Sequence, residues 1–255
     1  MKTLLWVFGI AGLIVVVGFV GLIILGVSMS NYQQERFFKA VDSGDVKKVM
    51  GEFHPILREE VDEPIIAAWV TAVNEHCGKF KGLKEDTWTE GTREDNGVTV
   101  KTSKGTVNFE KGQVSADLDF AQGGVVKFYV GTELLPIDWF KGPASNDLYR
   151  KQAEKLIRLL LTNQPDKAFA MMHESLQKEM PLEKLRALMA RITKNVGAVK
   201  VIQFKSDQNL QGDVFKLKVL YDVECENGKT VATVVFIFKD MKGHILAFDL
   251  TGEGI

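Results

Sequence analysis

A weak internal repeat is the feature that most constrains what this chain can fold into. When the 255-residue sequence is shifted by 119 residues, the stretch 37–83 aligns with 156–202 without a gap. His54 then meets His173, and Gly78 meets Gly197. Other matches join apolar residues: Phe38 with Ile157, Val41 with Leu160, Met50 with Phe169, Ile66 with Leu185, and Val73 with Ile192. Self-similarity at a fixed spacing is typical of a duplicated structural unit, so the sequence predicts two copies of one domain.

Each copy is expected to contain helices followed by strands. A long helix should carry a buried stripe at helical spacing and end at Gly78 or Gly197. The turn ENGK at 226–229 predicts a hairpin, and a first strand should follow each closing glycine. Further strands are expected at 98–109, 114–120 and 125–130, and again at 215–224, 231–238 and 245–250. The order of elements predicts an α+β fold, with helices packed on a four-stranded antiparallel sheet in each copy.

The stretch NEHCGKF at 74–80 sets a histidine beside a cysteine. Cys77 aligns with Val196, which indicates a small buried hydrophobic residue rather than a reactive thiol. A metal site needs further ligands at suitable spacing, and the sequence supplies none nearby, so we expect neither a metal nor another cofactor. Cys77 and Cys225 fall on different elements of different copies and are predicted to be buried, reduced thiols.

The N-terminal stretch Leu4–Val27 contains no charged side chain. About 20 apolar residues in a helix span a bilayer, whereas the apolar region of a signal peptide usually runs about 7–15 residues. We therefore favour a retained single-pass membrane anchor over a cleaved signal peptide. Lys2 precedes the stretch and charges of mixed sign follow it, which favours a cytoplasmic N-terminus and extracytoplasmic domains at the cell membrane.

The charge balance bears on the class of partner, and a linker separates the two expected domains. Lysine plus arginine is 32 against 33 acidic residues, so there is no basic field of the kind that binds nucleic acid. The segment GTELLPIDWFKGPASNDL at 131–148 reads as a linker. The predicted boundaries are 1–30 for the anchor, 31–130 for the first domain, 131–147 for the linker and 148–255 for the second domain.

The first copy resembles a known superfamily. The order of elements, and especially FFKAVDSGDVKKVMGEFHPILREEVDEPIIAAWVTAVNEHCGKFKG, is similar to the NTF2-like (cystatin-like) superfamily. Within it the chain looks most like a bacterial domain family of unknown function, DUF3887. The resemblance implies cone-shaped domains in which a curved sheet wraps the long helix and can enclose a cavity. The superfamily includes enzymes, ligand binders and assembly modules, so the fold alone does not choose a function. No position matches the catalytic acids of its enzymes.

Three functions are compatible with these features. The first is a membrane-anchored, non-catalytic extracytoplasmic module that binds a small ligand or an envelope protein. The second is an NTF2-like enzyme that uses a histidine in a cavity, with His54 and His173 as the candidate acid–base groups and Trp69 as a further cavity residue. The third is an assembly component of a secretion-type membrane complex, since tandem NTF2-like domains behind one span resemble inner-membrane components of type IV secretion machines. We favour the first, and expect both histidines to cap a helix end or to pack under a sheet, because no carboxylate pairs with both.

One strand of the second copy is predicted to be apolar on both faces. In VATVVFIF, Val235 and Ile237 stand between Phe236 and Phe238, whereas the matching strand of the first copy alternates apolar with polar residues. Lysines at 216 and 218 could cover the apolar residues with their methylenes. We prefer a contact surface, formed with the first copy or with a second molecule.

Overall fold

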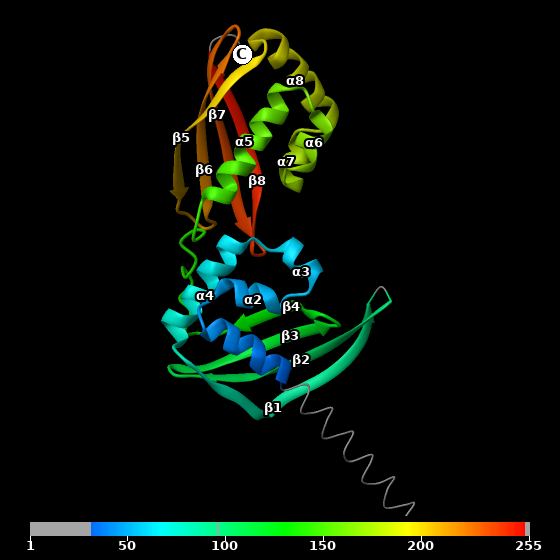
Figure 1. Ribbon diagram of the computed structural model, residues 1–255, viewed down its shortest axis with the longest axis vertical. Helices are drawn as coiled ribbons and strands as arrows, with labels where there is room; N and C mark the ends of the chain where they lie inside the picture. The colour runs from blue at the N-terminus through cyan, green and yellow to red at the C-terminus, as the bar shows by residue number, and fades with distance from the viewer. Residues whose placement is uncertain (1–31, 96, 253–255) are drawn as a thin grey trace, which may run out of the picture. The chain divides into compact units, whose positions relative to one another are not determined.

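The computed structural model describes residues 32–95 and 97–252 and has an α+β fold (Figure 1). The expected membrane span, 4–27, lies outside the described residues. Within the described ranges, no helix has the length and hydropathy needed to cross a membrane. Contacts divide the chain into two compact units, which are described separately. Unit 1 holds the described residues up to Leu57 together with Val73–Leu135, and unit 2 holds Arg58–Ala72 together with Pro136–Ile255. The predicted boundaries stay a prediction, and the grouping of Arg58–Ala72 with unit 2 was not expected.

The first sheet lies in unit 1 and has four strands in sequence order, all antiparallel. A helix over 32–42 and α2 (Val46–Glu52) lie on one of its faces (Figure 1). The short helix α3 (Pro55–Glu60) and the longer α4 (Glu63–Cys77) follow α2 and are divided between the units. The strands are β1 (Phe80–Asp95), β2 (Val98–Phe109), β3 (Gly112–Ala121) and β4 (Gly124–Gly131).

The second sheet lies in unit 2 and repeats this plan. Helices α5 (Asp147–Leu161), α6 (Pro165–Ala170), α7 (Glu174–Glu179) and α8 (Leu182–Val196) lie on one of its faces (Figure 1). Its antiparallel strands are β5 (Val199–Leu210), β6 (Lys216–Cys225), β7 (Gly228–Lys239) and β8 (Lys242–Gly252). The prediction of two four-stranded antiparallel sheets, each with helices, is confirmed.

The repeat is visible in local backbone geometry as well as in element order. The residue with positive φ after the first helix is Gly44 in one copy and Asn163 in the other. A parallel bridge ties the segment after α2 to β4, at Phe53 and Val125. The same bridge ties the segment after α6 to β8, at Met172 and Ile245. Each pair of matched helices, from α2 and α6 to α4 and α8, begins 119 residues apart, as the gap-free alignment requires.

The closing glycine of each long helix meets the turn between the second and third strands. Gly197 has φ 72° and ψ −162°, a region of the backbone map that is essentially restricted to glycine. The carboxylate of Glu226 accepts a hydrogen bond from the N–H of Ala198 at 3.0 Å, and the Glu226 N–H donates to the Ala198 carbonyl at 2.9 Å. A side chain on Gly197 would lie 2.9 Å from the Glu226 Cβ. Conformation and space therefore both require glycine there.

The first copy closes in the same way. The N–H of Lys79 donates to the Glu110 carboxylate at 3.3 Å, and the Glu110 N–H donates to the Lys79 carbonyl at 2.8 Å. Gly78 has φ 76°, and a side chain added there would lie 3.0 Å from the Glu110 Cβ. The duplication has thus kept a glycine–glutamate closure that fixes where the first strand starts after the helix.

Asp62 links the segment Arg58–Ala72 to the rest of unit 2. Its carboxylate accepts hydrogen bonds from the Tyr149 hydroxyl at 3.1 Å and from the Gly243 N–H at 2.9 Å. Its own N–H donates to the carbonyl of Met241 at 2.8 Å. Met241 and Asp240 form the β7–β8 turn and both have positive φ, a conformation that costs energy for residues other than glycine. The two bonds to Met241 and Gly243 hold this turn in place, and burial beside Asp62 raises the pKa of Tyr149.

Replacing Gly197 by alanine should destabilise unit 2 by about 1–3 kcal/mol, because alanine is strained in this backbone region. Gly212→Ala is the matched control, since Gly212 lies in a loop with no neighbouring atom closer than 4.0 Å to the added methyl. The urea concentration at the midpoint of unfolding of unit 2 is measured for both variants by proteolysis of the full chain. Equal midpoints for the two variants would contradict the closure described above.

Candidate functional site

The second sheet has an inner face against α5–α8 and an outer face on the opposite side. Successive residues of a strand point to opposite faces, and β6 follows this rule closely. Its inner residues Leu217, Val219, Tyr221, Val223 and Cys225 are all buried. Its outer residues are Lys216, Lys218, Leu220, Asp222 and Glu224, of which the two acids are exposed and the other three half-buried. We call the surface on this side of β5–β8 the outer face.

Strand β7 places a β-branched stripe on the outer face. Its inward residues Phe236 and Phe238 are 0% and 8% exposed, while its outward residues are half-buried: Val231, Thr233, Val235 and Ile237. Val235 is paired with Lys218 of β6 and Ala247 of β8, and Ile237 with Lys216 and His244. The two residues predicted as a contact surface therefore lie side by side on the outer face, with lysines beside them on β6 and Ala247 and His244 on β8.

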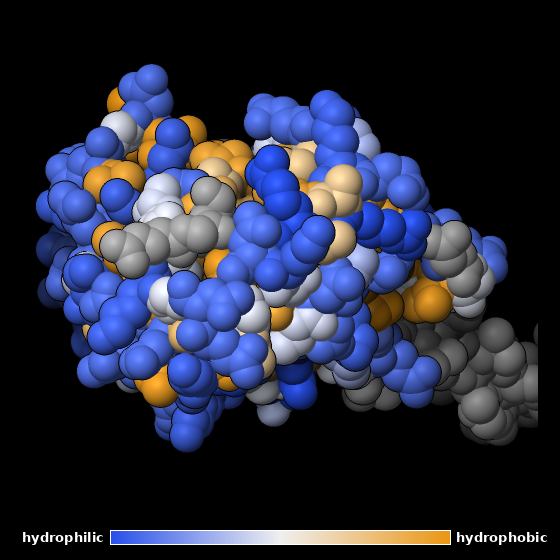
Figure 2. All heavy atoms as spheres, turned by 90° about the horizontal axis from the view of Figure 1, so that it is seen from above, coloured by the Kyte–Doolittle hydropathy of each residue, from blue (hydrophilic) through white to orange (hydrophobic). Residues whose placement is uncertain are grey.

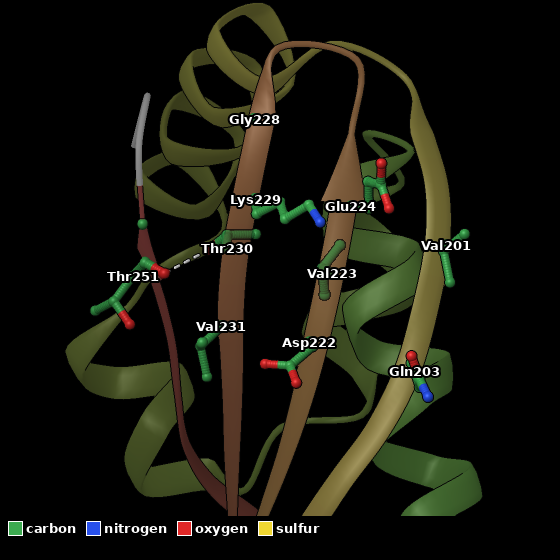
Figure 3. Close-up of a pocket in the computed structure, with 11 residues that line it drawn as sticks. Val201, Gln203, Asp222, Val223, Glu224, Gly228, Lys229, Thr230, Val231 and Thr251 are labelled. Atoms are coloured by element: carbon green, nitrogen blue, oxygen red, sulfur yellow. Dashed lines mark hydrogen bonds between the residues drawn. The ribbon is translucent and has the colours of Figure 1, made fainter.

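One end of the outer face is hollowed into a broad groove with a volume of about 750 Å³. In Figure 3, Lys229 extends from β7 toward β6, where Asp222 and Glu224 lie on the same side of the sheet. The Thr230 hydroxyl donates to the Thr251 carbonyl at 2.8 Å and holds β7 to β8 at this end. All four strands line the groove, through Val201, Gln203, Asp222, Val223, Glu224, Gly228, Lys229, Thr230, Val231, Thr251 and Gly252.

The charges on the two sheets are arranged differently. On the first sheet, Lys104 pairs with Asp117 at 2.7 Å and Arg93 pairs with Asp119 at 3.0 Å. On the outer face of the second sheet, Asp222 pairs with Lys205 at 2.8 Å. Within residues 32–95 and 97–252, no ion-pair partner lies within 4.0 Å of the other charges on β6, which are Lys216, Lys218 and Glu224. These charges remain available to a partner.

Exposed hydrophobic residues occur elsewhere on the molecule as well. Figure 2 shows a mainly hydrophilic surface with hydrophobic residues scattered among charged ones. Single exposed apolar residues are usual on proteins and do not mark a site. The outer face differs because its apolar residues follow one strand and are flanked by unpaired charges.

The histidines predicted as cavity residues occupy equivalent places in the two copies. The N–H of His54 donates to Val125 at 2.8 Å, and that of His173 donates to Ile245 at 2.9 Å. In each ring Nδ1 accepts a hydrogen bond at 3.3 Å from the N–H two residues on, that of Ile56 or Ser175. Both histidines therefore stabilise the start of a short helix, and the Nδ1 of each is already engaged.

The remaining predicted residues lie in the protein interior. Trp69 on α4 is 2% exposed. Cys77 and Cys225 are both buried and free, as expected, and burial raises the pKa of both thiols. Within the described part of the chain, no cluster of three or more His, Cys, Asp or Glu side chains is placed to hold a metal ion.

His244, which sequence reasoning did not single out, lies against His173 with ring centroids 5.2 Å apart. Burial lowers the pKa of His244, and the positive charges of His173 and Lys242 lower it further, against smaller opposing effects of Asp62 and Asp240. A histidine with a depressed pKa binds fewer protons when folded than when unfolded. Below about pH 6.5 the unfolded chain therefore gains protons first, and stability falls as the pH falls.

The variant His244→Asn should consequently lose less stability than the parent chain between pH 7 and pH 5. Urea midpoints of unit 2 at the two pH values measure the difference, and His76→Asn, on α4, is the control for loss of a histidine elsewhere. An unchanged pH dependence in His244→Asn would show that this ring does not titrate differently on folding.

Comparison with known proteins adds no assignment to this geometry. No protein-family model matches the sequence, and no curated protein matches it significantly. The candidate site therefore rests on the chain's own residues: an outer sheet face with a β-branched stripe, a groove and unpaired charges.

Proposed function

We propose that this chain is a membrane-anchored, non-catalytic binding module that contacts a protein partner through the outer face of its second sheet. The observation that carries the proposal is the contrast between the two sheets. On the first sheet, Asp117 and Asp119 of β3 each have an ion-pair partner. On the second, Lys216, Lys218 and Glu224 of β6 flank apolar residues and have no ion-pair partner within 4.0 Å among the described residues. An apolar centre with a polar rim is the usual anatomy of a protein interface.

The half-buried stripe on β7 favours a macromolecular partner over a small ligand. Small-molecule sites are usually concave and enclose most of the ligand, whereas this groove opens on a sheet surface and continues into the stripe. Val231, Val235 and Ile237 are partly exposed. Burying them further would stabilise a complex by about 25 cal/mol for each Å² of apolar area removed from water. The free energy gained by covering these residues is therefore distributed along β7.

The N-terminal stretch Leu4–Val27 supports the anchor, and the charges around it support extracytoplasmic domains. The resemblance to NTF2-like proteins and to DUF3887 is proposed on the same basis, from the sequence together with the two α+β units. The capping roles of His54 and His173 favour a structural function for both rings over acid–base catalysis.

Cysteine labelling tests whether the outer face is covered in its native setting. Thr233→Cys places a thiol in the centre of the outer face, and Thr106→Cys places one on β2, a central strand of the first sheet. Both threonines are half-buried, and the native cysteines are buried. In spheroplasts treated with a membrane-impermeant maleimide, Thr106→Cys should react quickly and Thr233→Cys slowly. After dilution in mild detergent, the two should react at similar rates.

Each result has a distinct meaning. Equal rapid labelling in spheroplasts would show that the outer face is free, which contradicts the binding proposal. If Thr106→Cys reacted only after the cells were opened, the domains would lie in the cytoplasm, and the orientation would be wrong.

A further inference from the structure

We infer that the partner of the outer face is a second copy of this chain, packed face to face with strands running in opposite directions. The inference rests on the proposed function, because it names the partner of the same surface. The order of residues along β6 is self-complementary when one copy is reversed.

Strand β6 carries the clearest pattern. Along the outer face it presents Lys216, Lys218, Leu220, Asp222 and Glu224 in that order. If β6 of a second copy lies over it in the opposite direction, Leu220 meets Leu220. Each lysine then meets an acid, Lys218 opposite Asp222 and Lys216 opposite Glu224. Since a two-fold interface uses the same patch twice, each of these pairs occurs twice.

Strand β5 and the middle of β7 follow the same reversal. Leu220 is paired with Thr233 of β7 and with Ser206 of β5, so these three residues mark one line across the sheet. Reversal about that line places threonine on threonine and serine on serine. Beyond the line it places Val235 opposite Val231, and Gln208 opposite Gln203. In these pairs apolar residues meet apolar residues and polar residues meet polar ones. Toward the ends of β7 Ile237 comes opposite Lys229, and on the edge strand β8 Asp249, which pairs with Thr233, comes opposite its own copy.

The size of the face is sufficient for a weak to moderate interface. Four strands about 4.8 Å apart, each with about ten residues at about 3.3 Å per residue, offer roughly 600 Å². Two such faces bury roughly 1,200 Å², the lower end of the range for stable protein interfaces. Facing sheets usually pack about 10 Å apart with their strands aligned within about 30°, a separation that long lysine and glutamate side chains can bridge. Asp222 already contacts Lys205 and can be shared with the partner's lysine.

The first sheet lacks this property. On β3 the outward residues Ser115, Asp117 and Asp119 carry one sign of charge, and both aspartates already have partners on β1 or β2. Reversal would place acid against acid or serine. The lysine–leucine–acid order of β6 therefore has no counterpart on β3.

Charge exchange between two tagged copies tests the inference. The full chain is co-expressed with two different C-terminal affinity tags and purified in mild detergent, and the fraction that carries both tags is measured. The acidic variant is Lys216→Glu with Lys218→Glu, and the basic variant is Asp222→Lys with Glu224→Lys. Like charges across an interface cost several kcal/mol, so each variant should self-associate on the order of a hundredfold more weakly than the parent.

Mixing the two variants should restore pairing, because every facing charge is then opposite in sign. Rescue also shows that both variants are folded. Lys104→Glu on the first sheet is the matched control and should pair like the parent. A parent that does not self-associate, or variants that each pair normally with themselves, would overturn the inference, and so would failure of the mixture to pair. If self-association is absent while Thr233→Cys remains protected in spheroplasts, a different protein covers the face and only the identity of the partner is wrong.

Discussion

The close approach of each long helix to a hairpin turn is the contact on which the rest of the unit depends. At Gly197 the chain leaves α8 in a glycine-only conformation, and Glu226 holds the next residue by two hydrogen bonds. This contact fixes where β5 begins relative to α8 and therefore which residues of the sheet face the helices. The Gly78–Glu110 contact does the same in the first copy. Both copies share this closure, and in both a side chain added to the glycine would crowd the glutamate.

A fixed inner face leaves the outer face free to differ between copies. Burial of Leu217, Val219 and Val223 beneath the helices constrains alternate residues of β6, whereas the intervening residues are limited only by solvent or by a partner. In the first sheet these positions are used for internal ion pairs such as Lys104–Asp117. In the second they carry a β-branched stripe and charges without local partners. The outward residues of the first sheet thus include ion pairs within that sheet. Those of the second sheet include charges and apolar residues that are suited to contact with a partner.

Much of the fold could be predicted from the sequence, because the features involved are periodic or local. The strand expected at 98–109 has those bounds in the structure, and the turn at 226–229 joins β6 to β7. Strand β7 begins three residues earlier than expected, because the tight turn lets Gly228 pair with Cys225. Val235 and Ile237 were identified because they are apolar where a strand with one polar face would carry polar residues. The groove was missed because its lining comes from all four strands, and no single stretch of sequence contains it.

The glutamate closure was missed for a different reason. Glu110 and Glu226 are 116 residues apart, so they do not coincide at the shift of 119 that aligns the helices. The proximity of His244 to His173 depends on β8 passing beside the start of α7, which is a tertiary contact. The grouping of Arg58–Ala72 with unit 2 likewise depends on the bonds of Asp62.

The central claim is that the outer face of the second sheet meets its own copy in reverse. Zero-length carbodiimide cross-linking of a mixture of unlabelled and isotope-labelled full chains tests it most directly, because the reagent joins only amines and carboxylates already in contact. We predict mixed-isotope peptides that link Lys218 to Asp222 and Lys216 to Glu224. Links of these residues found only within single-isotope peptides, or to residues off the outer face, would contradict it.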